Sequence, residues 1–112
     1  MLPFKNRIKK EKDFRKVFNA GKFVSLDFVS IKFSSNNLAE TRFGFIVSKK
    51  VSKKAVTRNR LKRIFREQTR LNLKNIKPGL DVVVIVKSSQ ITSVEARRIL
   101  LELFKRANIL NQ

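Results

Sequence analysis

One segment in the middle of the chain combines dense positive charge with the apolar spacing of a helix. Between Lys49 and Lys74 the sequence has 11 Lys or Arg residues and a single acid, Glu67. The apolar residues that interrupt this charge are Leu61, Ile64, Phe65 and Leu71. Their spacing predicts one buried stripe on a helix at about Thr57–Leu73. A disordered basic tail has no core to face and needs no such stripe, so we expect a folded helix that holds a fixed array of cations.

The cations of this predicted helix have almost no acidic partners. Arg58, Lys62, Arg66 and Arg70 follow one another at intervals of four residues. Like charges at that spacing repel each other by about 0.2–0.5 kcal/mol per pair, so a ligand that neutralises them is expected. The whole chain of 112 residues has a net charge of +19, far more than solubility requires. Nucleic acid is the expected ligand.

Hydrophobic periodicity divides the rest of the chain into short helices and strands. Thr92 and Glu95 match a capping box, in which a hydroxyl and a carboxylate satisfy opposite amides at a helix start. We expect one domain over residues 1–112, with helices packed on a small sheet. The predicted elements are a helix at Glu11–Ala20, strand structure at Phe23–Phe33, a strand at Arg42–Ser48, the basic helix, a strand at Asp81–Lys87 and a helix after Thr92.

The sequence has no pattern typical of a protein active site. Without His or Cys there is no imidazole general base, no disulfide and no Cys/His zinc site. The eight acids are scattered, whereas two-metal nucleases need several convergent acids. No Gly-rich phosphate loop is present. We therefore expect neither catalytic nor metal-binding residues on this protein.

Nothing in the sequence directs the chain to a membrane. The first 22 residues contain eight cations and no apolar run longer than two, unlike a signal peptide. No stretch approaches the roughly 18 continuous apolar residues of a membrane span. Together with the lack of Cys, these features predict a soluble cytoplasmic protein.

The ten Phe residues, with no Tyr or Trp, have two interpretations. Phe65 and Phe104 lie on helical apolar stripes and are expected in the core. Phe14 and Phe18, with one face of the following strand structure, could either join the core or line a groove at the edge of the sheet. Aromatic rings beside cations form a stacking platform for unpaired bases, but the pattern alone favours the core.

Three motifs lie in a fixed order along the chain. They are Asp13-Phe14-x-x-Val17-Phe18-x-x-Gly21, Arg42-Phe43-Gly44-Phe45-x-Val47-Ser48-Lys49-Lys50 and Arg58-Asn59-Arg60-x-Lys62-Arg63-x-x-Arg66-Glu67. In order and spacing they resemble the protein subunit of bacterial ribonuclease P. The resemblance implies a subunit that assists a catalytic RNA, which uses Mg²⁺, in removing the 5′ leader from precursor tRNA. It also implies an α/β (α+β) two-layer sandwich, α-β-β-β-α-β-α, with a left-handed βαβ crossover against the usual rule.

The same resemblance assigns two RNA-contacting regions. The basic helix is expected to face the catalytic RNA. With the other cations of that segment, the expected RNA-binding residues are Lys49, Lys50, Lys53, Lys54, Arg58, Asn59, Arg60, Lys62, Arg63, Arg66 and Arg70. A cleft between the first helix and the sheet is expected to hold the single-stranded leader, and its expected wall is Phe14, Phe18, Val29 and Ile31. Ile31 stands where some members carry Tyr, so only apolar contact is expected there.

The composition alone would also suit two other proteins. A ribosomal or other structural RNA-binding protein would show the same charge and mixed fold, but neither the Arg58-Asn59-Arg60 signature nor an apolar-walled cleft is expected of it. An architectural DNA-binding protein would need a dimerisation helix or a minor-groove wedge, and neither is evident.

Overall fold

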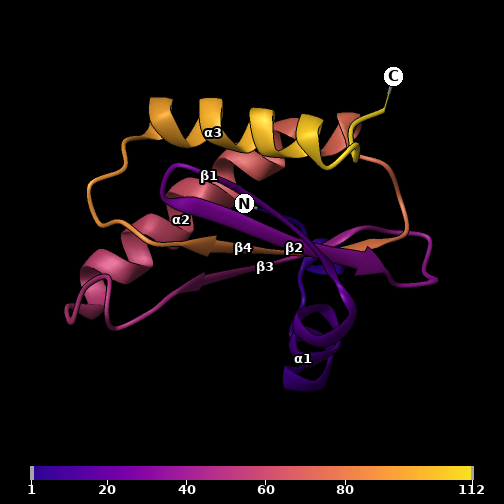
Figure 1. Cartoon of the computed structure of the whole chain (residues 1–112), viewed down its shortest axis with the longest axis horizontal. Coiled ribbons are helices and arrows are strands. Elements are labelled where there is room, and N and C mark those ends of the chain that lie inside the picture. Colours follow the sequence, from indigo (N-terminus) through magenta and orange to yellow (C-terminus); the bar gives the residue numbers. More distant parts are fainter. Residues whose placement is uncertain (1, 112) are drawn as a thin grey trace.

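The computed structural model describes residues 2–111 and confirms a mixed α/β fold. Its four-stranded sheet has the order β1-β2-β4-β3, as Figure 1 shows. The pairs β1–β2 and β2–β4 are antiparallel, and β3–β4 is parallel. The elements are η1 Phe4–Asn6, α1 Glu11–Ala20, β1 Lys22–Leu26, β2 Val29–Ser35, β3 Arg42–Val47, α2 Ala55–Asn72, η2 Leu73–Asn75, β4 Leu80–Val86 and α3 Ser93–Arg106.

Helices lie on both faces of the sheet but cover them unequally. On one face α2 packs over β3, α3 packs over β1 and β2, and the two helices contact each other. On the other face the short α1 lies against β2 and β4 (Figure 1). The sheet with α2 and α3 forms the expected sandwich, and α1 adds a partial layer behind it.

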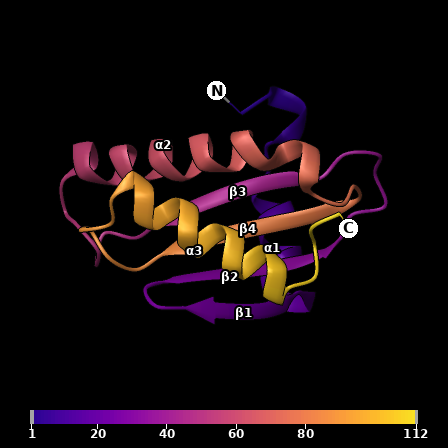
Figure 2. The same ribbon diagram turned by 90° about the horizontal axis from the view of Figure 1, so that it is seen from above.

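The connection from β3 through α2 to β4 has the unusual hand that the family resemblance implies. Figure 2 looks onto the sheet from the side of α2 and α3. When Figure 2 is turned so that the parallel strands β3 and β4 point upward, β4 lies to the left of β3. The chain leaves β3, passes through α2 in front of the sheet and then enters β4. This is a left-handed crossover, whereas nearly all such crossovers are right-handed.

The segment Phe23–Phe33 is a hairpin of two strands, β1 and β2, and not one continuous strand. Leu26 and Val29 pair across the turn, so Asp27 and Phe28 form a two-residue loop. Asp27 adopts a positive φ of 53°, a left-handed conformation that Asp tolerates better than most residues. The turn contains neither Gly nor Pro, so the pattern of β-branched and aromatic residues shows no break between the two strands.

The apolar core lies mainly between the sheet and the two helices α2 and α3. The buried residues of α2 are Leu61, Phe65 and Thr69. Leu71, expected in this stripe, is 58% exposed, and Thr69 takes the buried position with 0% exposure. With about 3.6 residues per turn, Thr69 follows Phe65 after one turn, whereas Leu71 lies about 120° away from it.

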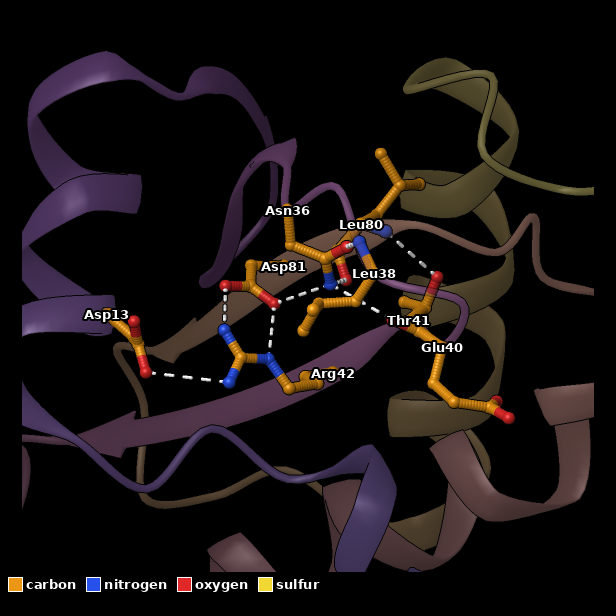
Figure 3. A network of polar contacts seen from close by, with 8 residues as sticks. All are labelled: Asp13, Asn36, Leu38, Glu40, Thr41, Arg42, Leu80 and Asp81. Carbon is orange, nitrogen blue, oxygen red and sulfur yellow. Dashed lines mark hydrogen bonds and ion pairs between the residues drawn. The ribbon is translucent and has the colours of Figure 1, made fainter.

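A buried ion pair joins the sheet to α1 and to the loop between β2 and β3 (Figure 3). Arg42 donates to both carboxylate oxygens of Asp81, at 2.9 and 2.7 Å, and to Asp13 on α1 at 3.5 Å. The Asn36 amide also donates to Asp81, at 2.9 Å, and to two backbone carbonyls. Hydrogen bonding to Asp81 raises the pKa of Arg42 above its ordinary value. One guanidinium thus fixes two strands and a helix together.

The N-terminal segment, residues 2–8, covers the outer edge of β3. The Ile8 amide donates to the Phe43 carbonyl at 2.9 Å, and Leu2 is buried with 1% exposure. Figure 2 shows this segment, in indigo, beside α2. An edge strand that is covered in this way cannot pair with another chain.

Arg42→Ala is expected to lower the free energy of unfolding by about 3 kcal/mol or more, because it leaves the Asp81 carboxylate buried without a charged partner. Urea unfolding followed by circular dichroism would measure the loss. The matched control is Arg106→Ala, which removes an exposed pair with Glu102 and should cost less than about 1 kcal/mol. Equal losses in the two variants would show that the Arg42 pair does not fix the fold.

Candidate nucleic-acid interface

The helix α2 presents polar side chains on a surface beside its buried stripe. At about 100° per residue, Asn59, Arg63 and Arg66 fall within about 60° of one another. All three are exposed. They also line a small cavity of about 240 Å³ together with Glu67 and with Leu2 of the N-terminal segment. The structure therefore brings these three predicted residues together on one surface, which we call the α2 face.

The cations of α2 are almost free of carboxylate partners. Within residues 2–111, no ion pair reaches Arg58, Arg60, Lys62, Arg63 or Arg66. Glu67 is the only acid of the helix, and Arg70 donates to both of its carboxylate oxygens. These hydrogen bonds lower the pKa of Glu67 and raise that of Arg70. Arg70 is therefore the predicted RNA-binding cation whose charge is already partly matched.

Two of the predicted arginines also fasten loops to α2. Arg58 donates to the Ser52 carbonyl at 2.9 Å, and Arg60 donates to the Ser89 carbonyl at 3.1 Å. A carbonyl is neutral and occupies one of the five guanidinium N–H groups, so each arginine keeps its charge and further donors. Both residues thus combine a structural contact with a remaining capacity to bind phosphate.

The predicted lysines before α2 lie in the loop that follows β3. All four are exposed, namely Lys49, Lys50, Lys53 and Lys54. The loop is turned by a hydrogen bond from the Val51 amide to the Ser48 carbonyl at 3.1 Å. It leads from the end of β3 into α2, so positive charge continues from the helix to the end of the sheet.

On the opposite face of the sheet, α1 places two half-buried aromatic side chains, Phe14 and Phe18. The Phe14 ring packs directly on the backbone of Gly44. Any residue with a Cβ at this position would bring that atom within 2.3 Å of the ring. The Lys32 ammonium lies 4.6 Å from the centre of the Phe18 ring. We call this surface the α1 face, and its rings and cation suit an unpaired base with its phosphate.

Val29 and Ile31 do not belong to the α1 face, and their assignment to the leader cleft is wrong. Both have 0% exposure and lie in the core cluster under α2 and α3. Because side chains alternate along a strand, they point away from the side that Lys32 shares with Phe18. The apolar residues that pack beside α1 are instead Ile8, Val83 and the partly buried Ile46 and Ile85.

Every acid of the chain has a partner within residues 2–111. Seven form ion pairs with Lys or Arg, and Glu95 closes the capping box of α3 with Thr92. In this part of the chain no three His, Cys, Asp or Glu side chains are grouped so that they could hold a metal ion. The same residues include no helix with the length and apolar character to cross a bilayer.

Gly44→Ala is expected to lower the free energy of unfolding by about 1–3 kcal/mol, because the new methyl group would force the Phe14 ring out of its place. In a Phe14→Ala background the obstacle is gone, so the same substitution should cost much less. Urea unfolding of the two single variants and the double variant measures the coupling. Strictly additive costs would mean that Phe14 does not pack on Gly44.

Comparison with known proteins gives one consistent result. The family model described as ribonuclease P matches residues 2–108. The ribonuclease P protein component of Clostridioides difficile is 41% identical over 105 residues, 91% of each chain. That of Clostridium botulinum is 40% identical over 109 residues, 95% of this chain and 97% of the relative.

Solved structures agree with the sequence relatives. The RNase P protein of Staphylococcus aureus superposes with a TM-score of 0.86 at 29% identity, covering 95% of this chain and 98% of that one. The RNase P protein of Thermotoga maritima gives 0.81 at 34% identity, covering 89% and 96%. With its left-handed crossover and the basic helix inside it, the chain belongs to the ribonuclease P protein family.

Proposed function

We propose that this protein binds two RNAs through the two faces of its sheet, the catalytic RNA through the α2 face and the leader of precursor tRNA through the α1 face. By its family, the chain is the protein subunit of ribonuclease P, an endoribonuclease that removes the 5′ leader from precursor tRNA. The observation that carries the assignment is the set of exposed α2 residues without acidic partners, Asn59, Arg63 and Arg66.

The α2 face suits a folded RNA. Arginine forks bind phosphate oxygens through paired hydrogen bonds, and Asn59 can bond a base edge or a ribose hydroxyl. The helix fixes the spacing of these groups before the RNA binds, so binding costs less conformational entropy than it would on a flexible segment. We infer that Arg63 and Arg66 contact the catalytic RNA directly, while Arg58 and Arg60 do so from positions that their backbone contacts already fix.

The α1 face suits a single strand. Phe14 and Phe18 offer apolar rings, and Lys32 offers a cation beside them for the phosphate. Stacking on a ring tolerates any base, because every base has a π-face. That tolerance fits a subunit that must accept leaders of many sequences. We therefore keep Phe14 and Phe18 as leader contacts and assign Lys32 to the same site.

We assign the chemistry of cleavage to the RNA subunit together with Mg²⁺. Within residues 2–111 the side-chain carboxylates are engaged by Lys, Arg or a helix start, and no three of them are grouped so that they could hold a metal ion. Its own contribution is electrostatic, because its net charge of +19 lowers the cost of bringing two polyanions together. We place this activity in the cytoplasm.

Two substitutions should separate the two surfaces. Arg63→Ala should weaken assembly with the catalytic RNA, because it removes a phosphate-binding guanidinium group from the α2 face. Phe18→Ala should leave assembly intact and weaken binding of leader-bearing substrate by about 5- to 150-fold, the effect of losing one stacked base. Filter binding of labelled catalytic RNA, precursor tRNA and mature tRNA would measure each effect.

Arg97→Ala is the matched control for Arg63→Ala, since it removes an exposed arginine from α3. Mature tRNA controls for Phe18→Ala, because it has no leader and its affinity should hardly change. Urea unfolding must show that Phe18→Ala remains cooperative. If precursor and mature tRNA lose affinity equally, Phe18 is a core residue and the leader assignment fails.

A further inference from the structure

A second basic cavity lies on the outer side of α1, next to the N-terminal segment. It has a volume of about 470 Å³ and is lined by seven Lys or Arg side chains and two acids. The residues that matter here are Phe4, Arg7, Lys9, Lys10, Lys12 and Lys16. None of them belongs to the α2 face or to the α1 face described above.

Most of the positive charge in this cavity has no acidic partner within residues 2–111. Its two acids, Asp13 and Asp81, are both bound by Arg42, and Lys5 pairs with Glu40 at 3.3 Å. The remaining five cations form no ion pair within residues 2–111. Loss of water and the charge of Arg7 lower the pKa of Lys9. A concave surface with unmatched positive charge attracts an anionic ligand.

An aromatic ring stands at the mouth of this cavity. Phe4 is 74% exposed, and the Lys9 ammonium lies over its ring. The backbone beneath the ring is well fixed, because Asn6 donates to the Thr41 carbonyl at 2.8 Å and the neighbouring residues cover β3. A single exposed apolar residue is ordinary on a protein surface. Here the Phe4 ring lies beside several Lys and Arg side chains, and that combination points to a ligand with both an aromatic and an anionic part.

We propose that this cavity binds an unpaired nucleotide of RNA, with its base stacked on the face of the Phe4 ring that Lys9 does not cover and its phosphates bound by Lys9 and the neighbouring cations. A small inorganic anion would contact the cations but would make no stacking contact with the exposed ring. Bases inside a duplex are stacked on one another and would not reach it, whereas an unpaired base can be turned out onto a side chain. The proposal rests on the RNA-binding function given above and adds a third contact to it.

The position of the N-terminal segment allows two sources for this nucleotide. Phe4 and Lys9 share a second, smaller cavity with Phe14 and Gly44 of the α1 face and with Arg66 of α2. The site therefore adjoins both proposed surfaces. A leader that leaves the α1 face could supply the nucleotide, and so could an unpaired loop of the catalytic RNA.

Photo-crosslinking with 5-iodouridine, which reacts with a stacked aromatic ring, tests the proposal in the holoenzyme. One arm places the probe at successive positions in the leader of a precursor tRNA. The other arm places it in unpaired segments of the catalytic RNA, with no substrate present. Mass spectrometry of the crosslinked peptides should identify Phe4 in one arm, and that arm names the source. A crosslink to Phe14 or Phe18 reports separately on the leader assignment.

Affinity provides the second readout. Phe4→Ala should weaken binding of the RNA identified by the crosslink by about fivefold or more. Folding is not at risk, because the ring is exposed and adds little to the core. Val94→Ala, which truncates a 79% exposed apolar side chain on α3, is the matched control. The proposal is overturned if neither arm crosslinks to Phe4, or if Phe4→Ala changes affinity no more than Val94→Ala.

Discussion

The ion pair between Arg42 and the buried Asp81 joins two strands of the sheet, the helix α1 and the loop between β2 and β3. It lies where the parallel strands β3 and β4 begin side by side, and its third contact reaches Asp13 on α1. Because a buried carboxylate without its partner is strongly unfavourable, this pair holds β3 and β4 together, and the contact of Arg42 with Asp13 links α1 to them. The next residue of α1, Phe14, packs against Gly44. The same pair that stabilises the fold therefore positions the wall of the proposed leader cleft.

The division of charge explains how so basic a chain folds and still binds RNA. The few acids are used within the fold, as partners of Arg42, as surface ion pairs or as a helix cap. Apart from Arg70, Lys5 and Arg42, the cations of α2 and of the N-terminal cavity form no ion pair within residues 2–111. Their mutual repulsion opposes folding, and bound RNA removes it, so RNA should stabilise the folded chain by mass action.

The sequence predicted the basic helix, although not every residue of its buried stripe, and it did not predict which face of the sheet the residues of β2 occupy. Arg63 and Arg66 could be placed because one helix carries both the buried stripe and the charge. Val29 and Ile31 were misplaced because β2 has covered residues on both faces, and alternation does not say which face meets α1. The cavity around Phe4 combines residues from the N-terminal segment, α1 and β3, and no local pattern joins them.

Lysine acetylation footprinting can show whether opposite faces of the sheet bind different RNAs. Lys62 reports on the α2 side, Lys32 on the α1 face and the exposed Lys105 on α3 serves as a reference. Catalytic RNA alone should protect Lys62, and Lys32 should become protected only when precursor tRNA with a leader is added. Equal protection of both lysines by catalytic RNA alone would contradict the account.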